Sequence, residues 1–151
     1  QGGRDYAEVA PVKPMTSARG EGTHRDHLAQ LVADGDKWLG GDTALYDTIW
    51  AAHQQMVENY DPEFVNSLVV FTDGENDDPN GGLSLTQLLN KLDDSYDAQR
   101  PVRVITIGMG EADASALQRI ADETGGTSYI AETPEDIERV FVEALLARGS
   151  G

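Results

Sequence analysis

Five acidic or amide side chains are crowded into six consecutive positions near the middle of the chain: Asp73, Glu75, Asn76, Asp77 and Asp78. They follow residues 68–71, a short apolar run with the composition of a strand buried on both faces. Gly74 permits a sharp turn, which leaves Asp73 at the carboxyl end of that strand, where open α/β sheets bind ligands. Crowded carboxylates repel one another unless water or a cation neutralises them. The loop suggests a cation site, with an ordinary solvated loop as the alternative.

A second polar stretch, Gly41-Asp42-Thr43, lies directly before a segment with apolar residues at helical spacing. Glycine lets a backbone approach a bound group closely, but Asp42 and Thr43 are also residue types that cap helices. Capping alone explains both side chains. We expect His53 on this helix to be structural rather than catalytic. The spacing predicts that the buried face of the helix carries Leu45, Ile49, Ala52 and Met56.

Two other patterns could suggest metal binding. His24 and His27 are three residues apart and share one face of a predicted helix, but no third ligand stands nearby, so we interpret the pair as solvated surface. Residues 73–84 do not fit a calcium-binding EF-hand loop, because Asp78 stands where glycine is needed and Ser84 where glutamate is needed.

Composition limits the classes of partner. The chain has 151 residues, with 27 acidic against 11 basic side chains and a net charge of −16. This charge argues against a nucleic-acid backbone or an anionic membrane as a partner. The absence of cysteine excludes disulfides and thiolate ligands, and no apolar run reaches membrane-spanning length. We expect one domain over 1–148, with 149–151 as a linker or tail.

The order of the predicted elements indicates the fold class. Helices are expected to begin near Thr23, Ser84, Asp113 and Thr133, which are all capping residue types. From residue 68 onward strands and helices alternate, with further strands at 102–107 and 127–131. Helical crossovers imply a doubly wound α/β fold, with a mainly parallel sheet and helices on both faces. Residues 6–12 alternate weakly and predict an edge strand.

Four motifs in this order resemble a known family. They are Gly41-Asp42-Thr43-Ala44-Leu45-Tyr46-Asp47, Leu68-Val69-Val70-Phe71-Thr72-Asp73-Gly74, Ile105-Thr106-Ile107-Gly108 and Thr124-Gly125-Gly126-Thr127. Each is weak alone, but in sequence they look like a von Willebrand factor A domain over about residues 6–146. The likeness is strongest to bacterial envelope proteins that couple such a domain to a solute-binding-like region, which implies an extracellular or cell-envelope location.

The resemblance implies binding rather than turnover, so the chain is not expected to be an enzyme. In the family a metal-ion-dependent adhesion site holds Mg²⁺, or Mn²⁺ or Ca²⁺, and an acidic side chain of a protein ligand completes the coordination. Thr43 and Asp73 match two of the metal ligands. The surrounding ligand-binding surface would be made by Gly41, Asp42, Gly74, Glu75 and Asn76.

One family motif is missing from this sequence. The family places Asp-x-Ser-x-Ser after its first strand, and no such run occurs here. We therefore expect an amino-terminally truncated domain that lacks that strand, the next helix and the second strand. Thr43 and Asp73 would be two ligands of a site that needs about five or six. We therefore expect weak affinity for the cation, with binding of no metal at all as the alternative. The strand at 68–71 would have a free apolar edge, where we predict self-association or pairing with residues 6–12.

Two other function classes stay open. A metal-independent interaction or scaffold domain would use the same surface without a cation. A phosphotransfer enzyme would use Asp73 as nucleophile with Glu75 as the second carboxylate. The enzyme is disfavoured because Lys91, Arg100 and Arg103 are not placed at the carboxyl ends of strands, where a phosphate site needs them.

Overall fold

The computed structural model describes residues 6–34, 43–79, 81–133 and 136–147. Their contacts divide the chain into two compact units, Gln1–Asp42 and Thr43–Gly151. The expectation of one domain over 1–148 stays a prediction. In the described residues no helix is both long and apolar enough to cross a membrane.

The first unit contains a short hairpin and one helix. Strands β1 (Ala18–Arg19) and β2 (Gly22–Thr23) pair antiparallel, and α1 spans His24–Ala33. The predicted start of this helix is confirmed. The Asp26 carboxylate accepts a hydrogen bond from the Thr23 backbone N–H at 2.8 Å, and Thr23 Oγ1 accepts one from the Asp26 backbone N–H at 3.3 Å. This reciprocal capping box is a purely local device, which is why the sequence predicts it well.

Two expectations for this unit are wrong. Residues 6–12 form no strand, which fits their weak alternation and the missing N–H of Pro11. His24 is not solvated surface, because its side chain is 2% exposed. Its ring stacks on that of His27 with the centroids 6.5 Å apart, and its backbone N–H donates to the Ser17 carbonyl at 2.8 Å.

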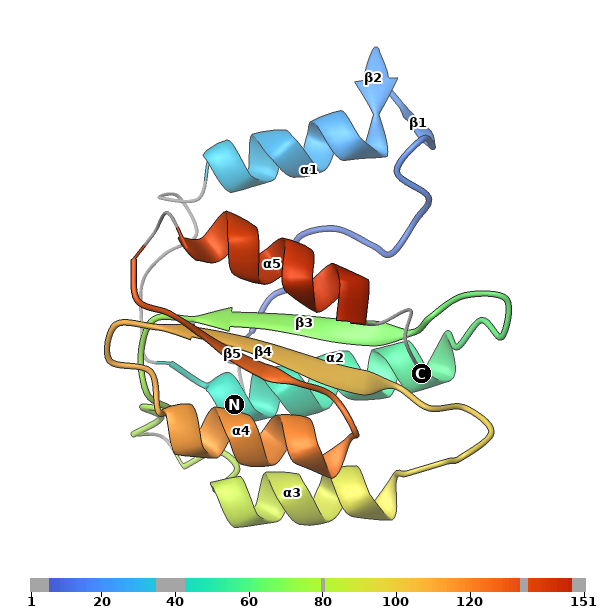
Figure 1. Cartoon of the computed structure of the whole chain (residues 1–151). Helices are drawn as coiled ribbons and strands as arrows, with labels where there is room; N and C mark the ends of the chain where they lie inside the picture. Colours follow the sequence, from blue (N-terminus) through green and yellow to red (C-terminus); the bar gives the residue numbers. More distant parts are fainter. Residues whose placement is uncertain (1–5, 35–42, 80, 134–135, 148–151) are drawn as a thin grey trace. The chain divides into compact units, whose positions relative to one another are not determined.

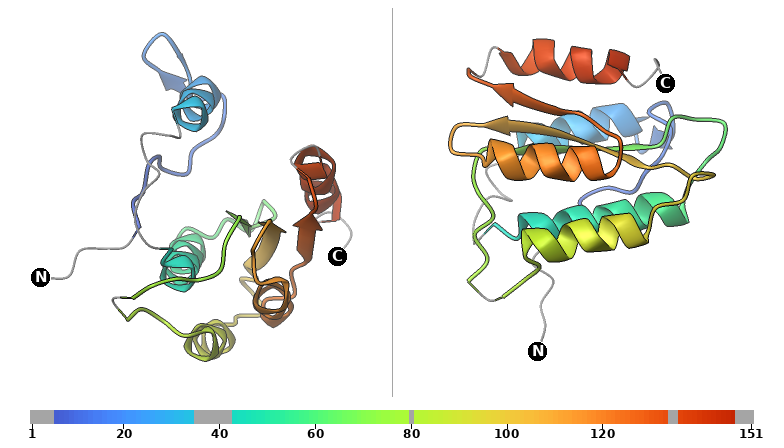
Figure 2. Two further views of the ribbon diagram at one scale, coloured as in Figure 1. Left: turned by 90° about the vertical axis from the view of Figure 1, so that its left-hand side faces the viewer. Right: turned by 60° about the horizontal axis from the view of Figure 1, so that its bottom comes forward.

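The second unit is a parallel α/β layer structure (Figure 1). Its strands are β3 (Ser67–Thr72), β4 (Arg103–Met109) and β5 (Ser128–Ala131), in the order β3-β4-β5 and all parallel. The helices are α2 (Leu45–Glu58), α3 (Leu85–Asp94), α4 (Ala114–Glu123) and α5 (Asp136–Ala147). Figures 1 and 2 show α2, α3 and α4 on one side of the sheet and α5 on the other. The doubly wound α/β class predicted from the sequence is confirmed.

The central strand of this sheet is β4 and not β3. Residues 104–108 of β4 are buried, whereas most of β3 is half-buried and Phe71 is 50% exposed. The prediction that 68–71 is buried on both faces is therefore wrong, because within the described residues β3 pairs with β4 on one side only. The Phe71 ring lies 5.8 Å from that of Phe141 on α5. The phenylalanine in β3 therefore packs against a helix and does not mark a central strand.

Helix α2 buries a face rotated by about one residue from the prediction. Tyr46, Ile49 and His53 are its buried side chains, and Ile49 alone belongs to the predicted set. Tyrosine and histidine are amphipathic, so a simple apolar pattern leaves them out, yet both are readily buried when a polar partner is present. The core cluster that Tyr46 and Ile49 join also contains Leu88, Leu89, Leu92, Val104 and Ile120.

The caps predicted for the later helices are confirmed for α3 and α4. Ser84 and Gln87 form a capping box, and the Asp113 side chain accepts from the Ala116 N–H at 2.9 Å.

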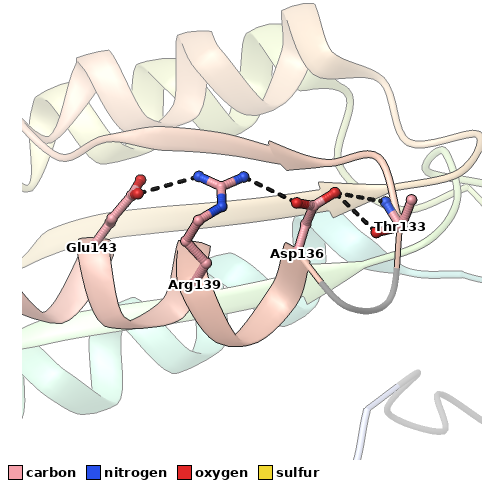
Figure 3. A network of polar contacts seen from close by, with 4 residues as sticks. All are labelled: Thr133, Asp136, Arg139 and Glu143. Atoms are coloured by element: carbon pink, nitrogen blue, oxygen red, sulfur yellow. Dashed lines mark hydrogen bonds and ion pairs between the residues drawn. The ribbon is translucent and has the colours of Figure 1, made fainter.

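At α5, Thr133 Oγ1 donates to the Asp136 carboxylate at 3.0 Å, and Arg139 bridges Asp136 and Glu143 (Figure 3). Hydrogen bonds from Arg139, then Thr133, lower the pKa of Asp136. Because this network is exposed, it contributes little to stability.

Candidate functional site

The acidic loop after β3 is paired with the stretch that begins α2. The Asp77 backbone N–H donates to the Thr43 carbonyl at 3.0 Å, and the two residues form an isolated antiparallel bridge. Two segments that the sequence marks as polar and separate therefore lie side by side in the second unit. The loop that carries Asp73 is in this way fixed to the residue that matches the family's threonine ligand.

Asn76 caps α2 from a distance. Its Oδ1 accepts a hydrogen bond from the Tyr46 backbone N–H at 3.1 Å. The residue at the N-cap position of α2 is Ala44, which has no side chain able to satisfy the first N–H groups. Thr43 was a candidate for the capping residue of α2, but it precedes the N-cap position by one residue. Asp42, the other candidate, is outside the described residues. Asn76, expected on the ligand-binding surface, thus points its carbonyl oxygen at its own chain.

We expect Asn76→Ala to destabilise the second unit by about 1 kcal/mol, because the Tyr46 N–H loses its acceptor at a helix start. Urea denaturation followed by circular dichroism measures this change. Asn59→Ala is the matched control, since Asn59 also bonds to α2 but at an exposed position. Equal stability losses for the two variants would contradict the capping role of Asn76.

Asp73 itself has a fixed backbone and an exposed side chain. Its carbonyl accepts from the Glu111 N–H at 3.2 Å, in the turn that follows β4. Thr72 Oγ1 donates to the Gly74 carbonyl at 3.0 Å and so closes the turn on the other side. Thr43, Asp73 and Glu75 are all exposed, whereas Gly74 is half-buried. The turn therefore presents carboxylates to solvent at the carboxyl end of the sheet. Gly41, also expected on this surface, lies outside the described residues.

The last carboxylate of the loop, Asp78, lies beside Asp47 of α2, a neighbour that sequence analysis missed. Asp47 Oδ2 accepts from the Leu83 N–H at 2.7 Å and ties the segment before α3 to α2. A Cβ added at Gly82 would overlap the carboxylate oxygens of both Asp47 and Asp78. A larger residue at this position would have to displace both acidic side chains. The signal in the sequence is the glycine pair Gly81-Gly82 beside an aspartate-rich loop.

The pKa of Tyr46 is shifted by the charges at this end of the unit. Burial raises the pKa of its hydroxyl, and the carboxylates of Asp113 and Glu75 raise it further, against the opposing effect of Arg119. The phenol is therefore held in its neutral form, in which its O–H can donate a hydrogen bond.

The donor chemistry suits a hard cation, but the described donor set is incomplete. A threonine hydroxyl and aspartate carboxylates are the oxygen ligands that Mg²⁺, Mn²⁺ and Ca²⁺ prefer. Within the described ranges, however, no group of three or more acidic or histidine side chains converges as a metal site. Thr43 and Asp73 would hold part of a coordination shell and leave the rest to other groups or to water.

The parallel sheet with helices on both faces places the chain among doubly wound α/β proteins. A family model described as "von Willebrand factor type A domain" matches residues 6–143. The chain belongs to the von Willebrand factor A family, and this membership makes it a protein-interaction module in general terms.

Comparison with solved structures finds similarity to the ArnB paralog VWA2 from Sulfolobus acidocaldarius, with 21% sequence identity and a TM-score of 0.48. The match covers 70% of this chain and 26% of that one, so the chain spans about a quarter of that protein's length. A search of curated proteins finds no match.

Proposed function

We propose that the loop surface made by Thr43, Asp73 and Glu75 binds a protein ligand with the help of a divalent cation. The observation that carries this proposal is the bridge between Thr43 and Asp77, which fixes the acidic loop beside the start of α2. An uncharged hydroxyl with few carboxylates leaves a cation short of negative charge, so that an acidic side chain from a partner is attracted to it. In this proposal the protein acts as an adhesion-type module in a bacterial cell envelope or a secreted protein.

The surroundings of the basic side chains favour binding over catalysis. Phosphotransfer would need a lysine or arginine beside Asp73. Arg100 instead pairs with Asp97 at 2.9 Å, and the Lys91 ammonium lies over the Trp50 ring, 4.8 Å from its centroid. We therefore propose that the chain is not an enzyme.

Calorimetric titration with Mg²⁺, Mn²⁺ and Ca²⁺ tests the cation requirement. We expect a dissociation constant of about a millimolar or weaker for this chain, because Thr43 and Asp73 leave most of the ion's ligands to water. Asp73→Ala should abolish the heat of binding. Asp93→Ala, which removes the same charge from an exposed position on α3, should retain it.

Micromolar affinity, or an equal loss of heat with Asp73→Ala and Asp93→Ala, would contradict this placement of the cation. The absence of heat with all three cations would support a metal-independent interaction domain instead. One observation favours that second function: Asn76 and Asp77 hold the loop in place by hydrogen bonds that need no metal. Self-association through the β3 edge stays a prediction.

A further inference from the structure

A small cavity lies at the end of the sheet opposite the acidic loop. It is lined by the second half of α2, the end of α3, the segment 95–100, the end of α4 and the residue before β4. Its volume is ≈ 10 Å³, which is room for about one water molecule. The lining residue His53 is 4% exposed, although histidine is rarely so buried without a reason.

The ring of His53 connects α2 to β4. Its Nε2 lies 3.3 Å from the Val102 carbonyl oxygen, which can only accept, so Nε2 carries the proton and donates. In this tautomer Nδ1 is an acceptor with a bare lone pair. It is buried and has no hydrogen-bond partner among the described atoms. The ring also stacks on Trp50 with the two planes 15° apart.

A second proton on this ring would be poorly accommodated. It would place an N–H at Nδ1 where no acceptor stands and would bury a positive charge. Among the groups around the cavity, the Asp97 carboxylate is already paired with Arg100, and Glu123 is exposed to water. Tyr96 also lines the cavity, and the Lys91 ammonium beside Trp50 adds a like charge.

Burial therefore dominates the titration of this group. It lowers the pKa of His53, and the hydrogen bond to the Val102 carbonyl opposes that shift only in part. Because the unfolded chain binds this proton more readily, stability is complete above the ordinary pKa of about 6.5 and is lost as the pH falls below it. The pKa of His27 in the first unit is also lowered, by burial first and then by Arg19 and His24, and acts in the same pH range. The lowered pKa values of Asp26, Asp97 and Asp136 act only below their ordinary value of 3.8.

We propose that His53 is a proton-sensitive latch, which holds α2 against the start of β4 while it is neutral and releases this contact when it is protonated. This inference stands on the cavity and the buried ring and does not depend on the proposed function. The latch would make the second unit loosen in a mildly acidic medium.

The test compares folding equilibria at about pH 7.5 and pH 5.5 for the wild-type chain, His53→Gln and His27→Gln. Glutamine can still donate to the Val102 carbonyl but does not titrate. His27→Gln removes a half-buried histidine from the other unit. For each unit by which the pKa of His53 is lower in the folded chain than in the unfolded chain, acidification lowers the folding equilibrium constant by up to tenfold. We expect wild type to show this fall in full, His27→Gln to lose only the share that His27 contributes in the first unit, and His53→Gln to lose most of it.

Nuclear magnetic resonance of the wild-type chain provides an independent measurement if His53→Gln does not fold. The His53 ring should titrate with a midpoint below about 6.5, and amide exchange at residues 102–104, corrected for its intrinsic rate, should accelerate over the same range. A midpoint at or above that value would overturn the latch, as would a fall in stability of His53→Gln equal to that of His27→Gln.

Discussion

Gly126→Ala is expected to destabilise the second unit by about 3 kcal/mol or more. A Cβ at Gly126 would overlap the carbonyl oxygen of Val104, and its carbonyl carbon would be 2.8 Å away. These are backbone atoms of the central strand β4, so they cannot move aside as a flexible side chain can. Relief of the overlap would require β4 to shift within a core where Val104 is fully buried. Urea denaturation monitored by circular dichroism gives the change in the free energy of unfolding.

Gly125→Ala is the matched control one residue earlier. Gly125 has φ of +66°, but nothing lies within 4 Å of a Cβ added there. The cost should therefore be the backbone strain alone, about 1–2 kcal/mol. An equal or larger loss for Gly125→Ala would mean that the conformation of the turn after α4, and not its approach to β4, limits stability.

The pair Gly125-Gly126 illustrates what a motif can and cannot predict. Its position after a helix predicts a helix end, which the structure confirms through the Gly126 N–H bonded to the Ala121 carbonyl at 2.8 Å. The close approach to Val104 is tertiary, and nothing in the local sequence predicts it. The capping boxes at Thr23 and Ser84 are predicted completely, because donor and acceptor stand three residues apart.

The candidate site likewise has some features that the local sequence predicts and others that depend on distant residues. Polar residue types after a strand and before a helix indicate where a site should be, and the bridge from Thr43 to Asp77 shows these two stretches side by side. The capping role of Asn76 could not be predicted, because its partner is 30 residues away. The buried face of α2 was misassigned for a related reason, since the Val102 carbonyl that binds the His53 ring is 49 residues away. Partners remote in sequence decide which polar groups are buried.

Ile49→Ala is expected to cost about 2–5 kcal/mol, whereas Ile49→Val should cost only about 0.5–1.5 kcal/mol. The Ile49 side chain is 1% exposed and belongs to the cluster that joins α2 to α3, α4 and β4. Truncation to alanine removes three carbons from this cluster and leaves a cavity that the surrounding helices fill only in part. The graded pair of variants separates loss of packed volume from any change in the propensity of α2 to be helical.

The same substitution should loosen the acidic loop, because the start of α2 is the surface to which this loop is bonded. The Tyr46 and Asp77 amides that make those bonds should exchange faster in Ile49→Ala than in Ile49→Val, measured by hydrogen exchange under native conditions. Val142→Ala on α5, where the side chain is 48% exposed, is the control and should leave both amides unchanged. If Ile49→Ala lowers the free energy of unfolding by less than about 0.5 kcal/mol, α2 is not anchored through this residue. The loop must then owe its position to its hydrogen bonds, those of Asn76, Asp77 and the Asp73 carbonyl.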